Sequence, residues 1–238
     1  RSSDLSQSNQ ADLASIKKEM PFLTDGQAKD VAFAEARFSK DDGFGVLYTN
    51  GTGTGKTFTG LGVVSRFNKD GKSNILIAAP SQAILDSWVK AAKNFFNLDV
   101  NLLPDTSSAG SGITATTFAN LGSNNALVGR EWDLIVTDEA HYLSSSQEGK
   151  SSLSLKKINA MALKEGSERE RANALNSSLV NEIKELQAIQ EPSEAIASKL
   201  TQLRAELTQA AKAEKERIKS TANKDKPRGL FLSATPFA

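Results

Sequence analysis

The chain has 238 residues and a nearly balanced charge, with 29 Lys and Arg against 28 Asp and Glu, so net charge alone indicates no polyanionic partner. Its composition, 39% hydrophobic and 24% charged, is typical of a folded globular protein. The absence of Cys excludes disulfides, thiolate metal sites and a cysteine nucleophile, and the single His excludes a multi-histidine metal site. Because the sequence has no long apolar run and no charged-then-apolar leader, we expect a cytoplasmic protein without membrane contact.

Short runs of β-branched and aliphatic residues alternate along the chain with stretches of helical periodicity. The predicted strands are Val46–Tyr48, Ile75–Ala79, Ile113–Thr116, Leu134–Val136 and Leu230–Leu232. Because these runs are continuously apolar, helices such as Thr57–Phe67 and Ala83–Phe96 should cover both of their faces, as in a parallel sheet with crossovers. The sequence therefore predicts a three-layer α/β domain formed by residues 1–142 and 229–238.

A segment without strand-like runs interrupts this pattern at residues 143–228, where 16 Lys and Arg meet 12 Asp and Glu. Apolar residues at steps of three and four indicate a helical seam, formed by Leu175, Leu179, Ile183, Leu186, Ile196, Leu200, Leu203 and Leu207. Because Pro192 resists a helix interior, the seam should fold back as an antiparallel hairpin over about residues 167–220, with about 25 residues in each half. The stretch of about residues 150–165 is predicted to be a crossover helix on the sheet.

The strongest chemical signal is Asn50-Gly51-Thr52-Gly53-Thr54-Gly55-Lys56-Thr57, which follows a predicted strand and precedes a predicted helix. In this context alternating glycines let backbone N–H groups approach phosphate oxygens closely. Lys56 would reach the β- and γ-phosphates of a nucleotide, and the Thr57 hydroxyl would complete the shell of a Mg²⁺ ion. Asn50 stands where the general motif has Gly, and Asn tolerates left-handed backbone. The segment is interpreted as a phosphate-binding loop rather than a glycine-rich turn without a ligand.

A second signal is Trp132-Asp133-Leu134-Ile135-Val136-Thr137-Asp138-Glu139-Ala140-His141, an apolar strand that ends in two adjacent carboxylates. Parallel sheets bind ligands at the carboxyl ends of their strands. Asp138 would hold Mg²⁺ directly or through water, and Glu139 would orient and deprotonate the attacking water. Alone, such a pair is usually a solvated turn, but together with the phosphate-binding loop it favours phosphoryl transfer.

These segments, in order and content, resemble the first RecA-like domain of a superfamily 2 helicase or translocase of the DEAH type, with Asp138 to His141 as motif II. The resemblance covers nearly everything outside residues 143–228, and it implies a RecA-like P-loop domain with the helical hairpin inserted between motifs II and III. The loop from Thr52 to Thr57 is similar to that of restriction-enzyme motor subunits, and the region of motifs Ia to II is similar to phage and bacterial helicases of the strawberry-notch type.

The resemblance also implies roles for residues around the nucleotide. Ser233-Ala234-Thr235 would be motif III, which couples the nucleotide state to nucleic-acid binding, and His141 would face it across the cleft. The alternative is that Ser233 and Thr235 are ordinary hydroxyls at a strand end. Gln27, ahead of a helix, would read the adenine edge of ATP; its alternative is a surface glutamine.

Three further residues would contact nucleic acid by the same resemblance. Ser81 and Gln82 belong to motif Ia and Thr117 to the region of motif Ib, both of which contact the nucleic-acid backbone in relatives. As bare sequence they are loop residues after strands, and Ser81 is also a suitable N-cap for the next helix.

The implied function is that of the ATP-binding half of a motor that hydrolyses ATP with Mg²⁺ and moves along or remodels nucleic acid, with DNA as the expected substrate. Because the sequence stops after motif III, we expect a fragment whose partner, a second RecA-like domain, supplies motifs IV to VI and an arginine finger. The chain by itself should then be weakly active.

Two other functions stay open. In one, the helical hairpin docks a protein partner and the α/β domain is its scaffold, although the seven basic and three acidic residues from Lys212 to Arg228 would also suit contact with the DNA backbone. In the other, the chain is a P-loop ATPase that acts on protein. Stimulation of ATP turnover by nucleic acid distinguishes these functions from the motor.

Overall fold

The computed structural model describes residues 7–49, 54–104, 107–144 and 152–234. Within them, six parallel strands form one sheet in the order β1-β6-β5-β2-β4-β3. The strands are β1 (Gly45–Tyr48), β2 (Ile75–Ala79), β3 (Asn101–Leu102), β4 (Ile113–Thr117), β5 (Leu134–Thr137) and β6 (Arg228–Leu232). The five predicted strands are confirmed, whereas the two-residue β3 carries no pattern that predicts it.

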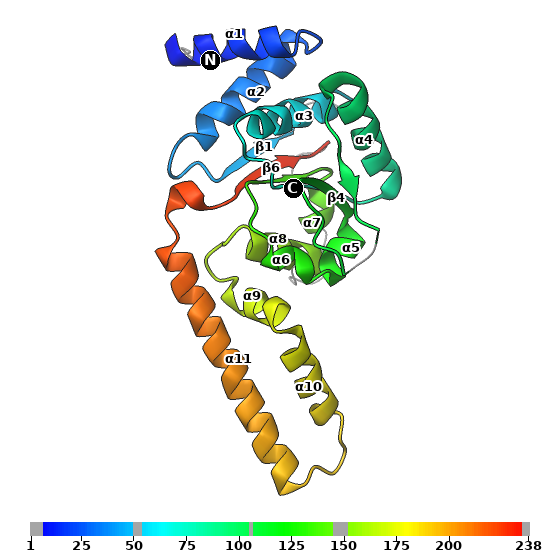
Figure 1. The fold of residues 1–238 in the computed structure, drawn as a ribbon, viewed down its shortest axis with the longest axis vertical. Coiled ribbons are helices and arrows are strands. Elements are labelled where there is room, and N and C mark those ends of the chain that lie inside the picture. Colours follow the sequence, from blue (N-terminus) through cyan, green and yellow to red (C-terminus); the bar gives the residue numbers. More distant parts are fainter. Residues whose placement is uncertain (1–6, 50–53, 105–106, 145–151, 235–238) are drawn as a thin grey trace.

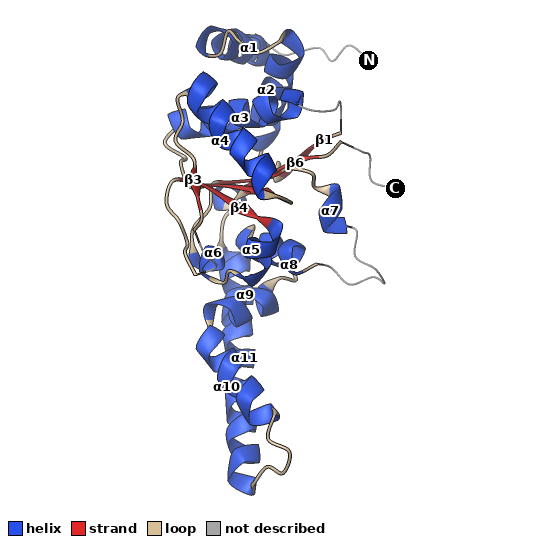
Figure 2. Cartoon of the chain, turned by 90° about the vertical axis from the view of Figure 1, so that its right-hand side faces the viewer, coloured by secondary structure: helices blue, strands red, loops and turns tan. Residues whose placement is uncertain are grey.

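Helices cover both faces of the sheet, as Figures 1 and 2 show. One layer consists of α1 (Gln7–Glu19), α2 (Asp25–Phe38), α3 (Thr54–Lys69) and α4 (Gln82–Phe96). The other consists of α5 (Phe118–Ser123), α6 (Ala126–Gly129), α7 (His141–Ser144) and α8 (Leu153–Met161). The predicted three-layer α/β architecture is therefore confirmed. No helix in the described part of the chain is long and apolar enough to cross a lipid bilayer.

The central strand β2 shows how the sequence produces two cores. All five of its residues are buried. Ile75 and Ile77 belong to the hydrophobic cluster under α1 to α4, and Leu76 and Ala78 belong to the cluster on the opposite face. Because successive side chains of a strand point to opposite faces, only a continuous apolar run fills both clusters.

An arm of antiparallel helices projects away from the sheet between β5 and β6 (Figure 1). Its outgoing half consists of α9 (Glu168–Leu175) and α10 (Ser177–Gln187). Its returning half is α11 (Glu194–Ser220), whose 27 residues span about 40 Å. The turn between the halves contains Pro192, as predicted, and Ser193 caps α11. After α11 the chain passes through a short 3-10 helix, η2 (Asn223–Asp225), directly into β6.

The outgoing half of the arm differs from the single helix that the apolar spacing predicts. It bends at Asn176, whose backbone (φ −122°, ψ 47°) leaves the helical region. The side-chain amide and the backbone N–H of Asn176 both donate to the Ala172 carbonyl oxygen (2.8 and 3.0 Å), which ends α9 at this residue. Leu175, the first residue of the predicted seam, is 42% exposed, whereas Ile183 and Leu203 are each only 7% exposed. The buried seam therefore begins after the bend.

The short helix α9 attaches the arm to the α/β domain. Ala174 belongs to the hydrophobic cluster on that face of the sheet. Arg171 is buried, pairs with Glu214 of α11, and donates to the carbonyl oxygens of Val128 (3.1 Å) and Ala160 (3.4 Å). The pKa of Arg171 lies below its ordinary value because the guanidinium is buried, and the nearby Glu214 carboxylate partly offsets this shift. Residues 167–220 thus include a helix that packs against the core.

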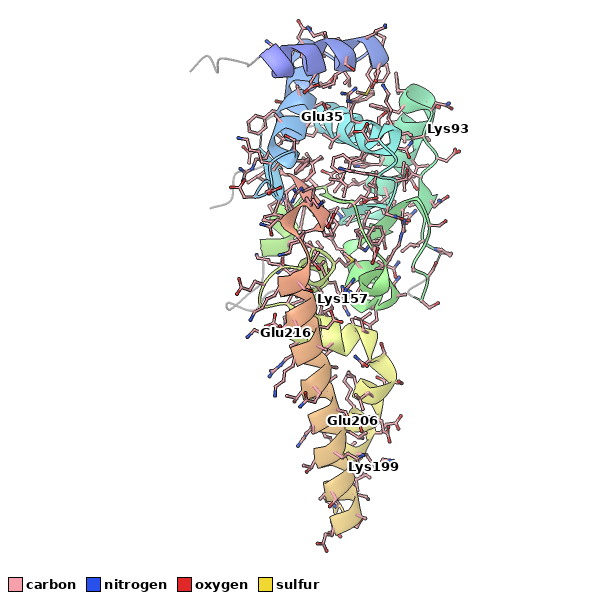
Figure 3. The ribbon with its side chains drawn as sticks, turned by 60° about the vertical axis from the view of Figure 1, so that its left-hand side comes forward. Glu35, Lys93, Lys157, Lys199, Glu206 and Glu216 are labelled. Atoms are coloured by element: carbon pink, nitrogen blue, oxygen red, sulfur yellow. The ribbon has the colours of Figure 1, made fainter. Side chains whose placement is uncertain are left out.

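Beyond this attachment the arm is largely solvent-exposed. Figure 3 shows Lys199 and Glu206 on the part of the arm that lies far from the sheet. Lys199 pairs with Glu182 across the two halves (3.0 Å), but both side chains are about half exposed, so the pair stabilises the arm little. The free part of the arm therefore depends mainly on its short apolar seam.

Candidate nucleotide-binding site

The predicted phosphate-binding loop leads into the N-terminus of α3, at the edge of the sheet where β1, β5 and β6 end. Gly51, Thr52 and Gly53 lie outside the described residues, and for Thr54 only the backbone is described. Gly55, Lys56 and Thr57 lie in the first turn of α3, with Thr57 partly buried. The helix N-terminus carries unpaired N–H groups and a partial positive charge, which together favour an anion.

Lys56 is the most informative residue of this turn. Its side chain is only 8% exposed, and its Nζ atom has no hydrogen-bond partner in the described part of the chain. A buried ammonium without a partner is costly, because it has lost its hydration and gained nothing in return. An anionic ligand with several oxygens, such as a nucleotide phosphate, would satisfy this group, so the residues present fit a bound nucleotide.

The turn after β5 places the two carboxylates of motif II. The N–H of Asp138 donates to Ala78 in β2 (2.8 Å), and the N–H of Ala140 donates to Leu232 in β6 (2.8 Å), so both neighbouring strands hold the turn. Glu139 between them has a φ of 52°, in the left-handed region that costs energy for a residue with a side chain. The flanking hydrogen bonds impose this conformation.

The Asp138 carboxylate is buried and held at both oxygens. Its Oδ1 accepts the N–H of Glu139 (2.8 Å), and its Oδ2 accepts the indole N–H of Trp88 (2.9 Å) from α4. No pattern in the sequence pointed to Trp88, because the contact joins residues 50 positions apart.

His141 joins motif II to the end of β6. Its Nδ1 lies 3.0 Å from Ser233 Oγ and 3.3 Å from Glu139 Oε2. Of the three residues that the resemblance groups around motif III, the structure brings His141 and Ser233 together, and Thr235 lies outside the described residues. The backbone N–H of Ser233 also donates to Tyr48 at the end of β1 (2.9 Å), which connects this group to the strand before the phosphate-binding loop.

Gln27 lies beside the start of α3. With Thr24 it forms a capping box at the N-terminus of α2, in which the Gln27 N–H donates to Thr24 Oγ1 (3.2 Å) and Gln27 Oε1 accepts the Thr24 N–H (2.9 Å). Its Nε2 donates to the Gly55 carbonyl oxygen (3.3 Å). The amide is therefore next to the phosphate-binding turn, and its contact with adenine stays a prediction.

The residues assigned to nucleic acid occupy the adjacent edge of the sheet and have local partners. Ser81 and Thr117 are the N-caps of α4 and α5, where they accept the N–H groups of Ile84 (3.3 Å) and Asn120 (3.2 Å). Gln82 and Thr117 also line one hollow of about 420 Å³. The structure groups these side chains at one edge, and their contact with nucleic acid stays a prediction.

Two described residues at this site could contribute oxygen ligands to a metal ion. The described residues contain no group of three or more His, Asp or Glu side chains that could hold a metal ion. Asp138 and Thr57 offer oxygen atoms, which suit Mg²⁺, an ion that in nucleotide sites takes few protein ligands and completes its shell with phosphates and water. The donor set fits Mg²⁺ bound together with a nucleotide.

The fold and the family match define the class of protein. In the sheet, β6 lies between β1, which precedes the predicted phosphate-binding loop, and β5, which precedes Asp138 and Glu139. This α/β domain is a RecA-like domain of superfamily 2. The chain belongs to the family described as the res subunit of Type III restriction enzymes, which matches residues 22–171. No curated protein matches the chain.

Several solved structures are similar to the chain. The Sulfolobus solfataricus SWI2/SNF2 ATPase core in complex with dsDNA is 26% identical, with a TM-score of 0.50 over 58% of this chain and 30% of that one. The S. solfataricus SWI2/SNF2 ATPase core domain is 21% identical, with a TM-score of 0.48 over 88% of this chain and 43% of that one. S. tokodaii Xpd4 is 18% identical, with a TM-score of 0.43 over 87% of this chain and 56% of that one. The chain thus spans between about a third and just over half of these structures.

Proposed function

We propose that this chain is the nucleotide-binding domain of a DNA motor, and that it hydrolyses ATP with Mg²⁺ when a second RecA-like domain closes on it. The observation that carries the proposal is the buried Nζ of Lys56 at the N-terminus of α3, which has no hydrogen-bond partner among the described residues. The ammonium would bind β- and γ-phosphate oxygens, and Gln27, already beside Gly55, would read the adenine edge.

Asp138 and Thr57 would hold Mg²⁺, which when bound neutralises charge that develops on the phosphates. Glu139 would orient the attacking water and take its proton on the carboxylate. Its left-handed backbone fixes the direction in which that carboxylate leaves the turn. His141, near both Glu139 and Ser233, would transmit the state of the nucleotide to β6.

Two observations support DNA as the partner. One of the similar structures, at 26% identity, is described as a complex with dsDNA. In addition, Lys212, Lys215 and Lys219 are exposed on α11. At 100° per residue they lie on the side of the helix opposite the buried Leu203, together with the exposed Glu216, which pairs with Lys219 (3.9 Å). The three lysines outnumber this one carboxylate, so the face keeps an excess of positive charge that suits a phosphate backbone.

The alternative partner of the arm is a protein, with the α/β domain as an ATPase scaffold. The exposed outer face of α11 would suit this role as well. The two candidates differ in their response to salt, because binding to phosphates releases counterions and weakens steeply as salt rises.

ATP turnover by the full-length protein tests the proposal. Double-stranded DNA should raise the rate, and the 238-residue chain alone should turn over slowly, because an arginine finger contributes about 10³ to 10⁵ in rate. Lys56→Ala should abolish the stimulated rate, while Lys90→Ala, at an exposed lysine of α4, should leave it unchanged. Turnover that DNA and RNA both leave unchanged, and that a protein stimulates, would contradict the motor.

A further inference from the structure

The indole of Trp88 is the only side chain, among the described residues, that is shown donating a hydrogen bond to the Asp138 carboxylate. Trp88 is fully buried in the middle of α4, and the two groups are 2.9 Å apart. A hydrogen bond from a neutral donor to a carboxylate is stronger than one between neutral groups, and burial strengthens it further. The contact therefore fixes one oxygen of a proposed metal ligand.

The geometry leaves room for a metal on the same carboxylate. An ionised Asp has about four lone-pair sites on two oxygens. The Glu139 N–H uses one site on Oδ1, and the Trp88 indole uses one on Oδ2. The described residues show no other donor to this carboxylate, so within them one site on each oxygen stays available, and the two donors determine which way these sites point.

Gly60 is what allows the indole to reach this position. Gly60 lies in α3, one helical turn after Lys56. A Cβ atom at Gly60 would come within 2.5 Å of Trp88 Cη2 and 3.2 Å of Leu232 Cδ1. The ring therefore lies against α3, the helix that carries Lys56, while its N–H contacts Asp138, so it ties the phosphate side of the site to the metal side.

The second tryptophan of the chain provides an internal comparison. Trp132 is 4% exposed, and its indole N–H donates to the Leu127 carbonyl oxygen (2.8 Å). Trp132 precedes β5, whereas Asp138 follows that strand, so the two residues lie at opposite ends of β5. A buried indole needs only some acceptor, and a backbone carbonyl is sufficient. Burial of the indole therefore does not by itself explain why Trp88 donates to the Asp138 carboxylate.

We propose that Trp88 is a positioning residue for Asp138, which orients the carboxylate toward Mg²⁺ bound with a nucleotide. This inference rests on the proposed function, because it takes Asp138 as the metal ligand. Groups that hydrogen-bond to metal ligands typically contribute about 10- to 100-fold to metal affinity or activity.

The test measures ADP binding to the whole chain by calorimetry, in EDTA and over a series of Mg²⁺ concentrations. Trp88→Phe keeps the ring and removes the donor, and it should raise the Mg²⁺ concentration for half-maximal enhancement of ADP binding about 10- to 100-fold. Affinity in EDTA should not change, and Trp132→Phe should behave as wild type in both conditions. A wild-type Mg²⁺ dependence in Trp88→Phe overturns the inference alone, whereas a wild-type chain that never binds ADP overturns the proposed function and the inference with it.

A fluorescence experiment keeps the inference testable if Trp88→Phe unfolds. Trp132→Phe leaves Trp88 as the single tryptophan, since the chain has two. Its emission should change when Mg²⁺ is added to the ADP complex, because the metal withdraws charge from the oxygens that the indole contacts. The change should be absent in Trp132→Phe/Asp138→Ala. An unchanged emission, at Mg²⁺ concentrations where calorimetry detects the metal, contradicts the inference.

Discussion

Leu61 in the α/β domain and Leu203 in the arm are both helical leucines with little exposed surface, at 0% and 7%. Leu61 belongs to a cluster that draws on the sheet and four helices, so its neighbours come from distant parts of the sequence. Leu203 belongs to neither hydrophobic cluster and lies in the narrow seam between α10 and α11. From this comparison we expect that the proposed nucleotide site depends on the core, and that the free arm can change without altering the site.

Truncation of the two leucines tests the comparison most strongly. Leu61→Ala should lower the free energy of unfolding by about 4 kcal/mol, because a fully buried leucine leaves a cavity that the surroundings cannot fill. Leu203→Ala should cost about 2 kcal/mol or less, confined to the arm. Urea unfolding gives the two values, and hydrogen exchange shows where protection is lost. Equal losses of protection throughout the chain would show that arm and core unfold as one unit.

The attachment of the arm is the place where the two regions meet. Arg171→Met should lower the free energy of unfolding by about 3 kcal/mol, because Glu214, only 16% exposed, keeps only its longer ion pair with Arg217 (3.9 Å). The carbonyl oxygens that Arg171 contacts also lose this donor. Arg204→Met, at an exposed position of α11, is the control and should change stability by less than about 0.5 kcal/mol. The double variant Arg171→Met/Glu214→Leu should recover much of the loss. If Arg171→Met were as stable as the control, α9 would belong to the free arm.

Lys56→Ala tests the proposed nucleotide site, which belongs to the α/β domain rather than to the arm. The variant loses a charged partner for phosphate, so Mg²⁺-ADP should bind about 100-fold more weakly by calorimetry. Stability without nucleotide should not fall, because Nζ has no partner in the described residues. Lys90→Ala is the matched control. Equal affinity of the two folded variants would remove Lys56 from the site.

Shortening of the arm should have the smallest effect. Replacement of residues 180–210 by a short Gly/Ser linker should change the stability of the core by less than about 1 kcal/mol, because the closure cost of a loop depends only weakly on its length. Scanning calorimetry should give the same shift with Mg²⁺-ADP as for the intact chain. Replacement of residues 167–220 also removes Arg171 and Ala174 from the core, so it should be clearly less stable. A short replacement that loses the nucleotide shift would contradict the separation of arm and site.

The sequence predicts the parts of this structure that are encoded locally. The five longer strands are visible as apolar runs, and the loop before Thr57 and the carboxylates after β5 are visible as motifs. The contacts of Trp88 with Asp138 and of Gln27 with Gly55 join distant segments, so no local pattern reports them. The sequence does not predict the bend at Asn176 for another reason. A single residue leaves the helical backbone region, with its side chain bonded to Ala172, inside a region of otherwise regular helical spacing.

The position of the arm between two neighbouring strands has a consequence for folding. β5 ends at residue 137 and β6 begins at residue 228, yet the two are hydrogen-bonded neighbours in the sheet. Pairs so far apart in sequence generally form late, because the intervening loop must first be closed. The contact of Arg171 with Glu214 already brings the two ends of the arm together, which roughly halves the length of chain left to close. Each doubling of a loop's length raises the free-energy cost of closing it by only about 0.6 kcal/mol. If the arm folds early, its insertion therefore adds little to the free-energy cost of pairing β5 with β6.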